Sequence, residues 1–359
     1  MHTFNNNFFK MKKLIIKFLY LIKYLPYRLK KKIYDILKQD INNSLVNKNT
    51  EDYILNLEFK NTEFKLILPL DGISNLKQHY GELYGMRNGG PTYELMMMEV
   101  LTSLNYSKEE INFFDIGSYL GYYTVFMKQY NGKASVYSIE SNPKFCSYIK
   151  KSLMLNEIHD VNVDNIALSN NNISKIFFKN QLFTKDTLSE KIDNLTYSEI
   201  NTLDNAREFG KEVTSLTLDE YIENNKIYPN IIKIDVHASE GLLLEGSMKT
   251  LKNKNFDFLL LELHPDHALQ IFSKAYSRDK ILKLLLDFRL NCLIIDGFRA
   301  STRSTNRKQF LSDKIIKYKI IEQNNINDLL FGQDVLDMFI LVVRDIKMIS
   351  ENSNFSEIK

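Results

Sequence analysis

Apolar runs alternate with amphipathic stretches through the middle of the chain, and this pattern predicts alternating strands and helices. Residues 111–116 form a short apolar run that suits a strand buried on both faces. Residues 120–127 carry apolar side chains at helical spacing, residues 134–139 repeat the strand pattern, and Asn142-Pro143 is typical of a helix start. Strand, glycine turn, helix and strand in this order predict a nucleoside-binding α/β half-domain.

The alternation continues on both sides of this segment. Thr217-Leu218-Asp219-Glu220 has the pattern of a capping box and predicts the start of a helix. The remaining expected elements are a hairpin at residues 53–59 and 64–68, strands at 161–168, 231–236, 256–263, 292–295 and 337–343, and helices at 92–104 and 279–288. The expected parts of the chain are a basic helical extension (1–40), a hairpin and helix (41–110), the main α/β domain (111–345) and a tail (346–359).

The glycine turn after the first strand indicates the kind of ligand. Gly117 allows a sharp backbone turn and Gly121 opens the following helix, and bare backbone of this kind lets a ligand approach closely. Glu140 ends the next strand, where a carboxylate can accept hydrogen bonds from both hydroxyls of a ribose. The spacing Gly-x-x-x-Gly lacks the Gly-x-Gly-x-x-Gly that seats a pyrophosphate, so a ligand without phosphates, such as S-adenosylmethionine, fits better. An ordinary strand, turn and helix with an incidental acid would leave the same pattern.

Five short motifs together resemble a known family. They are Phe-Asp-Ile-Gly-Ser-Tyr-Leu-Gly (114–121), Ser-Ile-Glu-Ser-Asn-Pro (138–143), Ser-Leu-Thr-Leu-Asp (215–219), Lys-Ile-Asp-Val (233–236) and Leu-Leu-Glu-Leu-His (260–264). In this order and spacing the chain resembles the FkbM family of S-adenosylmethionine-dependent methyltransferases. The resemblance implies a class I methyltransferase fold, which is a Rossmann-like α/β fold with a seven-stranded, mostly parallel sheet and helices on both faces. It also implies S-adenosylmethionine as methyl donor and, usually, O-methylation of a hydroxyl on a sugar, glycan or polyketide-like acceptor.

The turn, the acid and the resemblance together indicate which residues bind the cofactor. They are Asp115, Gly117, Ser118, Gly121, Glu140, Ser141, Asn165 and Asp235. Two motifs depart from the family pattern. The first turn reads Gly-Ser-Tyr-Leu-Gly where Gly-Ala-Asn-x-Gly is common, which places bulky side chains at the expected cofactor site. The fourth strand is followed by Asp235-Val236-His237-Ala238 where Asp-Val-Glu-Gly is common, so an imidazole replaces an acid near the expected acceptor.

Asp235, His237, Glu262 and His264 are the candidate catalytic residues. The fourth and fifth strands of such a sheet are neighbours, and residues two apart on a strand point the same way, so these side chains can converge on one pocket. His237 is assigned as the base that takes the proton of an acceptor hydroxyl, with Asp235 as its orienter or acceptor-binding partner. Alternatively, Asp235 caps a turn and His237 is a solvent-facing loop residue. No metal ligand is assigned, although two histidines and two carboxylates could bind a divalent metal if they converge.

Composition excludes some other classes. The chain has 359 residues, 44% of them hydrophobic, and a formal net charge of +3. This near balance of charge argues against a nucleic-acid partner, because a dedicated binder collects a strong basic patch. Cys146 and Cys292 are too few for a disulfide framework and are expected to be buried thiols of a cytoplasmic protein. The expected partner is a hydroxyl-bearing small molecule or glycan, and the sequence does not set the oligomeric state.

Residues 11–38 are basic and amphipathic, with Pro26 interrupting the pattern. No uncharged apolar stretch is long enough to span a bilayer, and no small-residue cleavage site follows an apolar core. The segment predicts either a helix on the inner face of an anionic membrane or an extension packed on the domain or a partner subunit. Residues 80–87 are a candidate lid over the cofactor, and residues 170–212 are a polar insertion expected to shape the acceptor pocket.

Two other functions fit parts of the pattern. A nicotinamide-dependent oxidoreductase would use the same turn and Glu140, but it needs the pyrophosphate seat that the glycine spacing lacks. A binding protein without catalysis is suggested by the altered residues 235–238. Stabilisation by NAD without a response to S-adenosylmethionine would favour the oxidoreductase.

Overall fold

The computed structural model of the chain describes residues 52–69, 95–104, 110–171, 176–179, 210–272, 275–295, 315–330 and 337–358. The chain divides into two units, Met1–Tyr53 and Ile54–Lys359, and nearly all described residues belong to the second. The basic segment at 11–38, the candidate lid at 80–87 and most of the polar insertion at 170–212 lie outside the described residues. Among the helices that are described, none is both long and apolar enough to cross a membrane.

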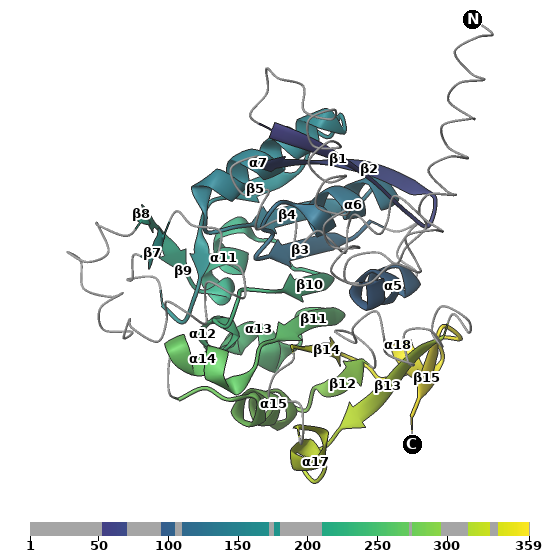
Figure 1. The fold of residues 1–359 in the computed structure, drawn as a ribbon. Coiled ribbons are helices and arrows are strands. Elements are labelled where there is room, and N and C mark those ends of the chain that lie inside the picture. The colour runs from purple at the N-terminus through teal and green to yellow at the C-terminus, as the bar shows by residue number, and fades with distance from the viewer. Residues whose placement is uncertain are drawn as a thin grey trace, which may run out of the picture. The chain divides into compact units, whose positions relative to one another are not determined.

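A nine-stranded sheet forms the centre of the second unit, in the order β15-β13-β12-β14-β11-β10-β3-β4-β5 (Figure 1). Its strands are β3 (Asn112–Ile116), β4 (Ser135–Ile139), β5 (Asn162–Asp164), β10 (Ile231–Ile234), β11 (Phe258–Leu263), β12 (Asn291–Ile295), β13 (Ile316–Ile321), β14 (Met338–Val343) and β15 (Phe355–Glu357). The strands from β5 to β11 run parallel, whereas β14 lies antiparallel between β11 and β12. This is a mostly parallel, class I methyltransferase-like sheet, as expected from the sequence.

The central strands are almost wholly apolar, with one charged residue each in β10 (Lys233) and β11 (Glu262) and none in β14. Every residue of β10, β11 and β14 is buried, because helices cover both faces of the sheet and leave no solvated side. The chain order reverses at β3, since β4 lies on one side of it and the later strand β10 on the other. In open α/β sheets a ligand crevice forms at such a reversal, outside the carboxyl ends of the strands. The ends of β3 and β10 carry Gly117 and Asp235.

The predicted number of seven strands is wrong for this chain, because β13 and β15 extend the sheet beyond β12. The single strand expected at residues 161–168 is also wrong. Its first half, β5, pairs with β4, and its second half, β6 (Ala167–Leu168), pairs with β9 (Ser215–Leu216) in a separate sheet. Asn165 causes the break, because its Nδ2 donates to the carbonyl oxygens of Glu140 (3.0 Å) and Ser141 (2.7 Å) where the ladder would continue.

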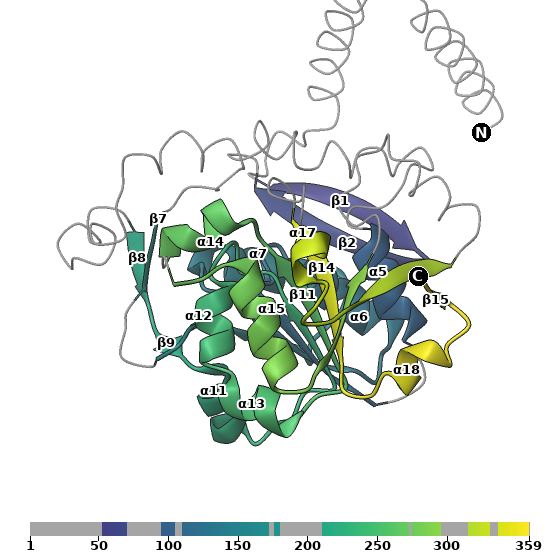
Figure 2. The ribbon, with the colours of Figure 1, turned by 90° about the horizontal axis from the view of Figure 1, so that it is seen from below.

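Helices cover the sheet on both faces. Figure 2 shows α5 and α6 on one face and α11, α13 and α15 on the other. The described helices are α5 (Leu95–Ser103), α6 (Tyr122–Tyr130), α7 (Pro143–Leu155), α11 (Leu218–Asn225), α12 (Glu240–Glu245), α13 (Met248–Asn253), α14 (Asp266–Phe272), α15 (Arg278–Asp287), α17 (Ile326–Leu330) and α18 (Lys347–Ser350). The capping box predicted from the sequence is confirmed at the start of α11, where Thr217 and Glu220 bond reciprocally.

The predicted hairpin packs on the outer side of two of these helices. Strands β1 (Asp52–Phe59) and β2 (Thr62–Pro69) form a two-stranded sheet, joined by Lys60 and Asn61, which both have positive φ. The Phe64 ring lies 5.6 Å from the Phe126 ring of α6. The Ile67 N–H donates to Ser152 Oγ of α7 at 2.9 Å, so the hairpin is fixed by both apolar and polar contacts. A further small sheet pairs β7 (Ile176–Lys179) with β8 (Gly210–Val213).

Candidate functional site

The glycine turn after β3 lies at the point where the strand order reverses. Gly117 has φ +76°, and a Cβ built there would lie 1.8 Å from the carbonyl oxygen of Asp235. Only glycine fits, because both the backbone conformation and the neighbouring strand exclude a side chain. Gly121, with φ +82°, directly precedes α6. Gly117 was expected to allow a sharp turn whose bare backbone a ligand could approach. In the structure, glycine at this position also leaves room for the end of β10.

Glu140 connects this turn to the end of β4. Its side chain is buried, and its two oxygens accept hydrogen bonds from the backbone N–H groups of Tyr119 (2.8 Å) and Asn142 (2.7 Å). Burial raises the pKa of Glu140 to about 7, while these two bonds and the positive charge of Lys233 oppose the rise. The sequence predicted a carboxylate that binds a ribose, and the structure shows a carboxylate that also braces the turn.

Tyr119 takes a left-handed conformation with φ 52°. Such a conformation is uncommon for a side chain of this size and is stabilised here by the bond from its N–H to Glu140. Its ring lies edge-on to Phe145 of α7, with the ring centroids 4.5 Å apart. The bulky residue that departs from the family pattern therefore packs against a helix.

The other predicted cofactor residues hydrogen-bond to the frame of this turn. Asp115 Oδ2 accepts from Thr124 Oγ1 at 2.6 Å, and Ser118 Oγ donates to the Asp115 carbonyl oxygen at 2.6 Å. Asn165 holds the backbone of Glu140 and Ser141, as described above. These side chains hold the turn after β3 and the end of β4 in shape through hydrogen bonds within the protein.

Lys233 is a buried cation beneath the turn. Its Nζ lies 3.4 Å from Asp115 Oδ1 and 3.7 Å from Asp235 Oδ2, and it donates to the Gly117 carbonyl oxygen at 3.1 Å. These contacts give Lys233 a structural, salt-bridged role at the end of β10. Removing Lys233 would leave the Asp115 carboxylate, which has no exposed surface, without this counter-charge.

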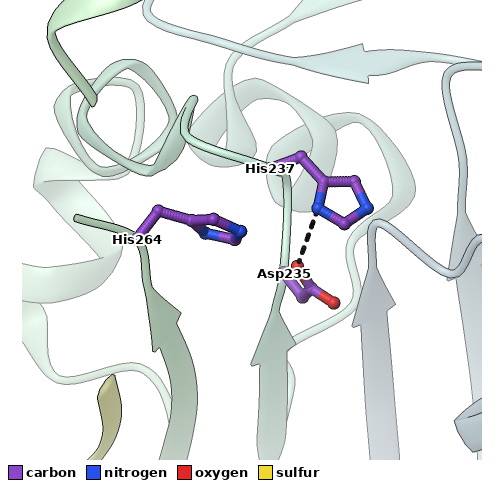
Figure 3. Close-up of side chains that lie close together, drawn as sticks. All are labelled: Asp235, His237 and His264. Carbon is purple, nitrogen blue, oxygen red and sulfur yellow. Dashed lines mark ion pairs between the residues drawn. The ribbon is translucent and has the colours of Figure 1, made fainter. Parts of the chain in front are cut away.

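Asp235, His237 and His264 come together as the sequence predicts (Figure 3). Asp235 Oδ1 lies 3.8 Å from His237 Nδ1, and the rings of His237 and His264 lie edge-to-face with centroids 5.6 Å apart. The His237 side chain is 55% exposed, against 15% for Asp235 and 12% for His264. Solutes can therefore reach His237 after the end of β10, whereas Asp235 and His264 are mostly covered.

Glu240, which was not singled out in the sequence, hydrogen-bonds to the segments that follow β10 and β11. Its Oε1 accepts from His264 Nδ1 at 3.0 Å and from the Ala238 N–H at 3.1 Å, and the residue has no exposed surface. In the sequence, Glu240 is only an acid at the first position of an apolar helix, where acids are common because they stabilise the helix N-terminus. Its contact with His264 depends on the sheet that places β10 beside β11.

The two histidines have opposite electrostatic surroundings. Burial alone lowers the pKa of His264, but Glu240, through its charge and its hydrogen bond, together with Glu262 and Asp235, raises it to about 10. Desolvation lowers the pKa of His237, opposed by Asp235 and reinforced by His264. Because more than half of the His237 ring faces solvent, we take this lowering to be small. At neutral pH His237 is therefore available as a proton acceptor.

A second group of metal-ligating side chains shares His264. It consists of Glu262, His264 and Asp337, which offer donor atoms within 4.8 Å of one another. Leu263 of β11 pairs with Met338 of β14, so the antiparallel register places Asp337 opposite His264. Both donor groups contain imidazole and carboxylate ligands, which suit a transition-metal ion better than Mg²⁺ or Ca²⁺.

The chain was compared with known families and proteins. Residues 115–290 match the family described as the methyltransferase FkbM domain. No curated protein matches the chain. A methyltransferase FkbM from Methylobacillus flagellatus KT is 13% identical with a TM-score of 0.33, and the match covers 50% of this chain and 37% of that one.

Two further solved structures are similar over longer stretches. M. jannaschii TYW2 in complex with AdoMet is 10% identical with a TM-score of 0.35, over 82% of this chain and 86% of that one. The plantazolicin methyltransferase BpumL in complex with SAH is 11% identical with a TM-score of 0.34, over 77% and 90%. Similarities of this size carry no conclusion about the present chain. The family match is the finding that bears on this chain: residues 115–290 match the methyltransferase FkbM domain.

Proposed function

We propose that this chain is an S-adenosylmethionine-dependent methyltransferase that acts on a hydroxyl group of a small-molecule or glycan acceptor. The observation that carries the proposal is the position of the glycine turn and Glu140. Both lie where the strand order reverses, at the crevice that α/β sheets use for nucleoside ligands. The family match over residues 115–290 supports the same activity.

The residues present fit an adenosine group without phosphates. Protein atoms already fill the Cβ positions of Gly117 and Gly121, the Asp235 carbonyl oxygen at the first and the Ile149 side chain at the second, so these glycines set the shape of the turn over which the ligand would lie. A carboxylate has about four acceptor positions, and three of those on Glu140 accept hydrogen bonds from the Tyr119 N–H, the Asn142 N–H and, at 3.4 Å, Ser141 Oγ. The remaining position, on Oε2, suits one hydroxyl of a ribose.

The bound donor supplies an electrophilic methyl group, whose bond to sulfur breaks as its bond to the acceptor oxygen forms. The chain's own residues must hold the acceptor hydroxyl in line and remove its proton. We assign His237, whose side chain is exposed, as the base that accepts this proton. Asp235, 3.8 Å away, would orient the His237 ring. The residues that carry the methyl-transfer chemistry thus follow directly after β10, next to the cofactor turn.

Cofactor binding is tested by thermal unfolding of the full chain. S-adenosylmethionine or S-adenosylhomocysteine at about 100 times its Kd adds about 2.7 kcal/mol of stability, which raises Tm by several degrees. NAD at the same concentration serves as the matched control and should leave Tm unchanged. Stabilisation by NAD alone would contradict the proposal and favour an oxidoreductase.

The role of His237 is tested with a labelled methyl donor and a panel of glycans and lipids, read by mass spectrometry. His237→Ala should lower kcat by about 10²–10⁴ while the affinity for S-adenosylhomocysteine stays the same, because a general base acts in the chemical step. His267→Ala, on the exposed surface of α14, is the control. Unchanged turnover in His237→Ala would remove that residue from catalysis.

A further inference from the structure

Three metal-ligating atoms meet at the carboxyl ends of β10 and β11. Asp235, His237 and His264 each offer one atom within 4.8 Å of the other two, and Figure 3 shows the His264 ring directed toward the other two side chains. Atoms that share an ion at about 2.0–2.2 Å lie roughly 3–3.5 Å apart, and the 3.8 Å between Asp235 Oδ1 and His237 Nδ1 is close to that. We propose that these three residues, the metal triad, bind a divalent transition-metal ion.

Glu240 prepares His264 for this role. Its carboxylate accepts a hydrogen bond from Nδ1 of His264 at 3.0 Å, so Nε2 is the nitrogen that can bind an ion, in exchange for the proton that the raised pKa of His264 keeps on the ring. Metal-binding histidines usually carry such a carboxylate on the other ring nitrogen, where it fixes the tautomer and the direction of the ring. The same carboxylate also accepts the Ala238 N–H at 3.1 Å, so one buried group positions both histidine-bearing segments.

The backbone that carries His237 is held in a strained form. His237 and the following Ala238 have φ values of 47° and 76°, in the left-handed region that costs side-chain-bearing residues about 1–3 kcal/mol each. Ser239 stabilises the turn by donating from Oγ to the Val236 carbonyl oxygen at 2.8 Å. Such a backbone conformation is kept only where the surrounding structure imposes it. At this position it brings the His237 ring beside Asp235.

The charges around the triad favour a cation. Glu240, Glu262 and Asp337 add three buried carboxylates to that of Asp235. Within the described residues, Glu240 Oε2 is buried without a hydrogen-bond partner. Lys233, 3.7 Å from Asp235, and Arg278, which donates to the His264 carbonyl oxygen at 2.9 Å, offset part of this negative charge. A divalent ion would offset more of it.

The ligand types indicate which ion is bound. Two imidazoles and one carboxylate are typical of sites for Zn²⁺, Fe²⁺ and similar ions, whereas Mg²⁺ and Ca²⁺ prefer all-oxygen sites. Three protein ligands leave coordination positions open, and the 55% exposure of His237 places them toward solvent. The site is therefore accessible to a solute as well as to the ion.

A catalytic role for the ion rests on the proposed function, whereas ion binding itself does not. Positive charge at the triad would favour loss of the proton from an acceptor hydroxyl. In the ion-free protein His237 would take that proton. In the ion-loaded protein His237 would be a ligand, and the proton would pass to the solvent that reaches its side chain.

Co²⁺ titration of the full, untagged chain tests the site directly. Co²⁺ bound by imidazole and carboxylate absorbs visible light, and we expect a saturable signal at one ion per chain. Mg²⁺ in millimolar excess should not displace it, whereas Zn²⁺ should. Glu240→Gln should weaken Co²⁺ binding by about 10–100-fold, as expected for the loss of a partner behind a ligand.

His237→Ala separates this site from any other. The ring is mostly exposed, so the fold should tolerate its loss, and Co²⁺ affinity should fall by more than in Glu240→Gln. His267→Ala, which removes an exposed histidine outside the triad, should bind like the unmodified chain. A circular dichroism spectrum of each variant checks that it is folded.

The outcomes distinguish this inference from the proposed function. No saturable Co²⁺ signal, or equal affinity in His237→Ala and the unmodified chain, would overturn the metal triad and leave methyl transfer unaffected. Co²⁺ binding that depends on His237, in a protein that S-adenosylmethionine does not stabilise, would support the triad and contradict the proposed function.

Discussion

At the scale of single residues, Glu140 has a structural role in addition to the ribose-binding role predicted for it. The acid was predicted from its place after a strand, which is the place that a ribose-binding carboxylate takes. Its bonds to the N–H groups of Tyr119 and Asn142 add a structural role to that prediction. Its environment therefore makes the stability of the ligand-free protein depend on pH.

The sign of that dependence follows from the pKa of Glu140. Burial raises it from 4.5 to about 7, so between these values the folded protein holds a proton that the unfolded chain has lost. The free energy of unfolding should therefore fall as pH rises from 4.5 to 7, by about 3 kcal/mol from this group. Urea unfolding at pH 5 and pH 7.5 measures it, and Glu140→Gln should lack this component of the decrease. An equal decrease in both proteins would show that other groups are responsible.

The candidate catalytic residues illustrate what a sequence can predict at this scale. The fourth and fifth strands were expected to be neighbours, and Asp235, His237 and His264 do come together at the ends of β10 and β11. The expected reason, that Asp235 and His237 share a strand face, is wrong, because β10 ends at Ile234 and a turn with φ 47° at His237 sets the position of its ring. Glu240 and Asp337 could not be predicted in the same way. Glu240 acts from the start of a helix, and Asp337 arrives beside His264 only through the antiparallel register of β14.

At the scale of elements, the turn between β3 and α6 is the most constrained piece of the molecule. Gly117→Ala should lower the free energy of unfolding by at least about 2 kcal/mol, because the new Cβ meets the Asp235 carbonyl oxygen at 1.8 Å and φ is +76°. Gly132→Ala is the matched control, since nothing lies within 4 Å of a Cβ there. Denaturant titration of both variants gives the comparison, and equal stability would mean that the turn can shift without cost.

Elements with strong periodicity were predictable, and elements defined by partners were not. The strands β3, β10, β11 and β14 are mostly apolar, and the capping box at Thr217 marks the start of α11 in the sequence. Residues 161–168 alternate apolar and polar side chains, but Asn165 interrupts the strand by donating to the backbone just after β4. A propensity pattern contains no information about such a distant bond.

At the scale of the whole molecule, the boundary between the two units predicts which truncations are tolerated. Deleting residues 1–51 should change Tm little, because the second unit begins at Ile54. Deleting residues 1–69 should destabilise the protein by more than about 5 kcal/mol, because it removes the buried apolar side chains of the hairpin, Phe59 and Phe64 among them, from Phe126. Thermal unfolding of the two truncated chains gives the test. A large loss of Tm in the shorter deletion would show that the first unit supports the second.

The size of the sheet was the least predictable feature at this scale. The resemblance implied seven strands, whereas β13 and β15 extend the edge beyond β12. Their side chains alternate between buried and exposed rather than forming an apolar run, so their pattern resembles that of polar connecting segments. The central order around β3, which creates the crevice, was nonetheless predictable from the alternation of strands and helices.

The place of β14 also matters while the protein is being made. This strand fills the gap between β11 and β12, and its partners are translated long before it. Until the ribosome has released residue 343, the nascent chain exposes an unpaired apolar strand edge at its centre. We therefore expect chaperones to bind the nascent chain, and chains that stop before β14 to aggregate, because the centre of the sheet is completed near the end of synthesis.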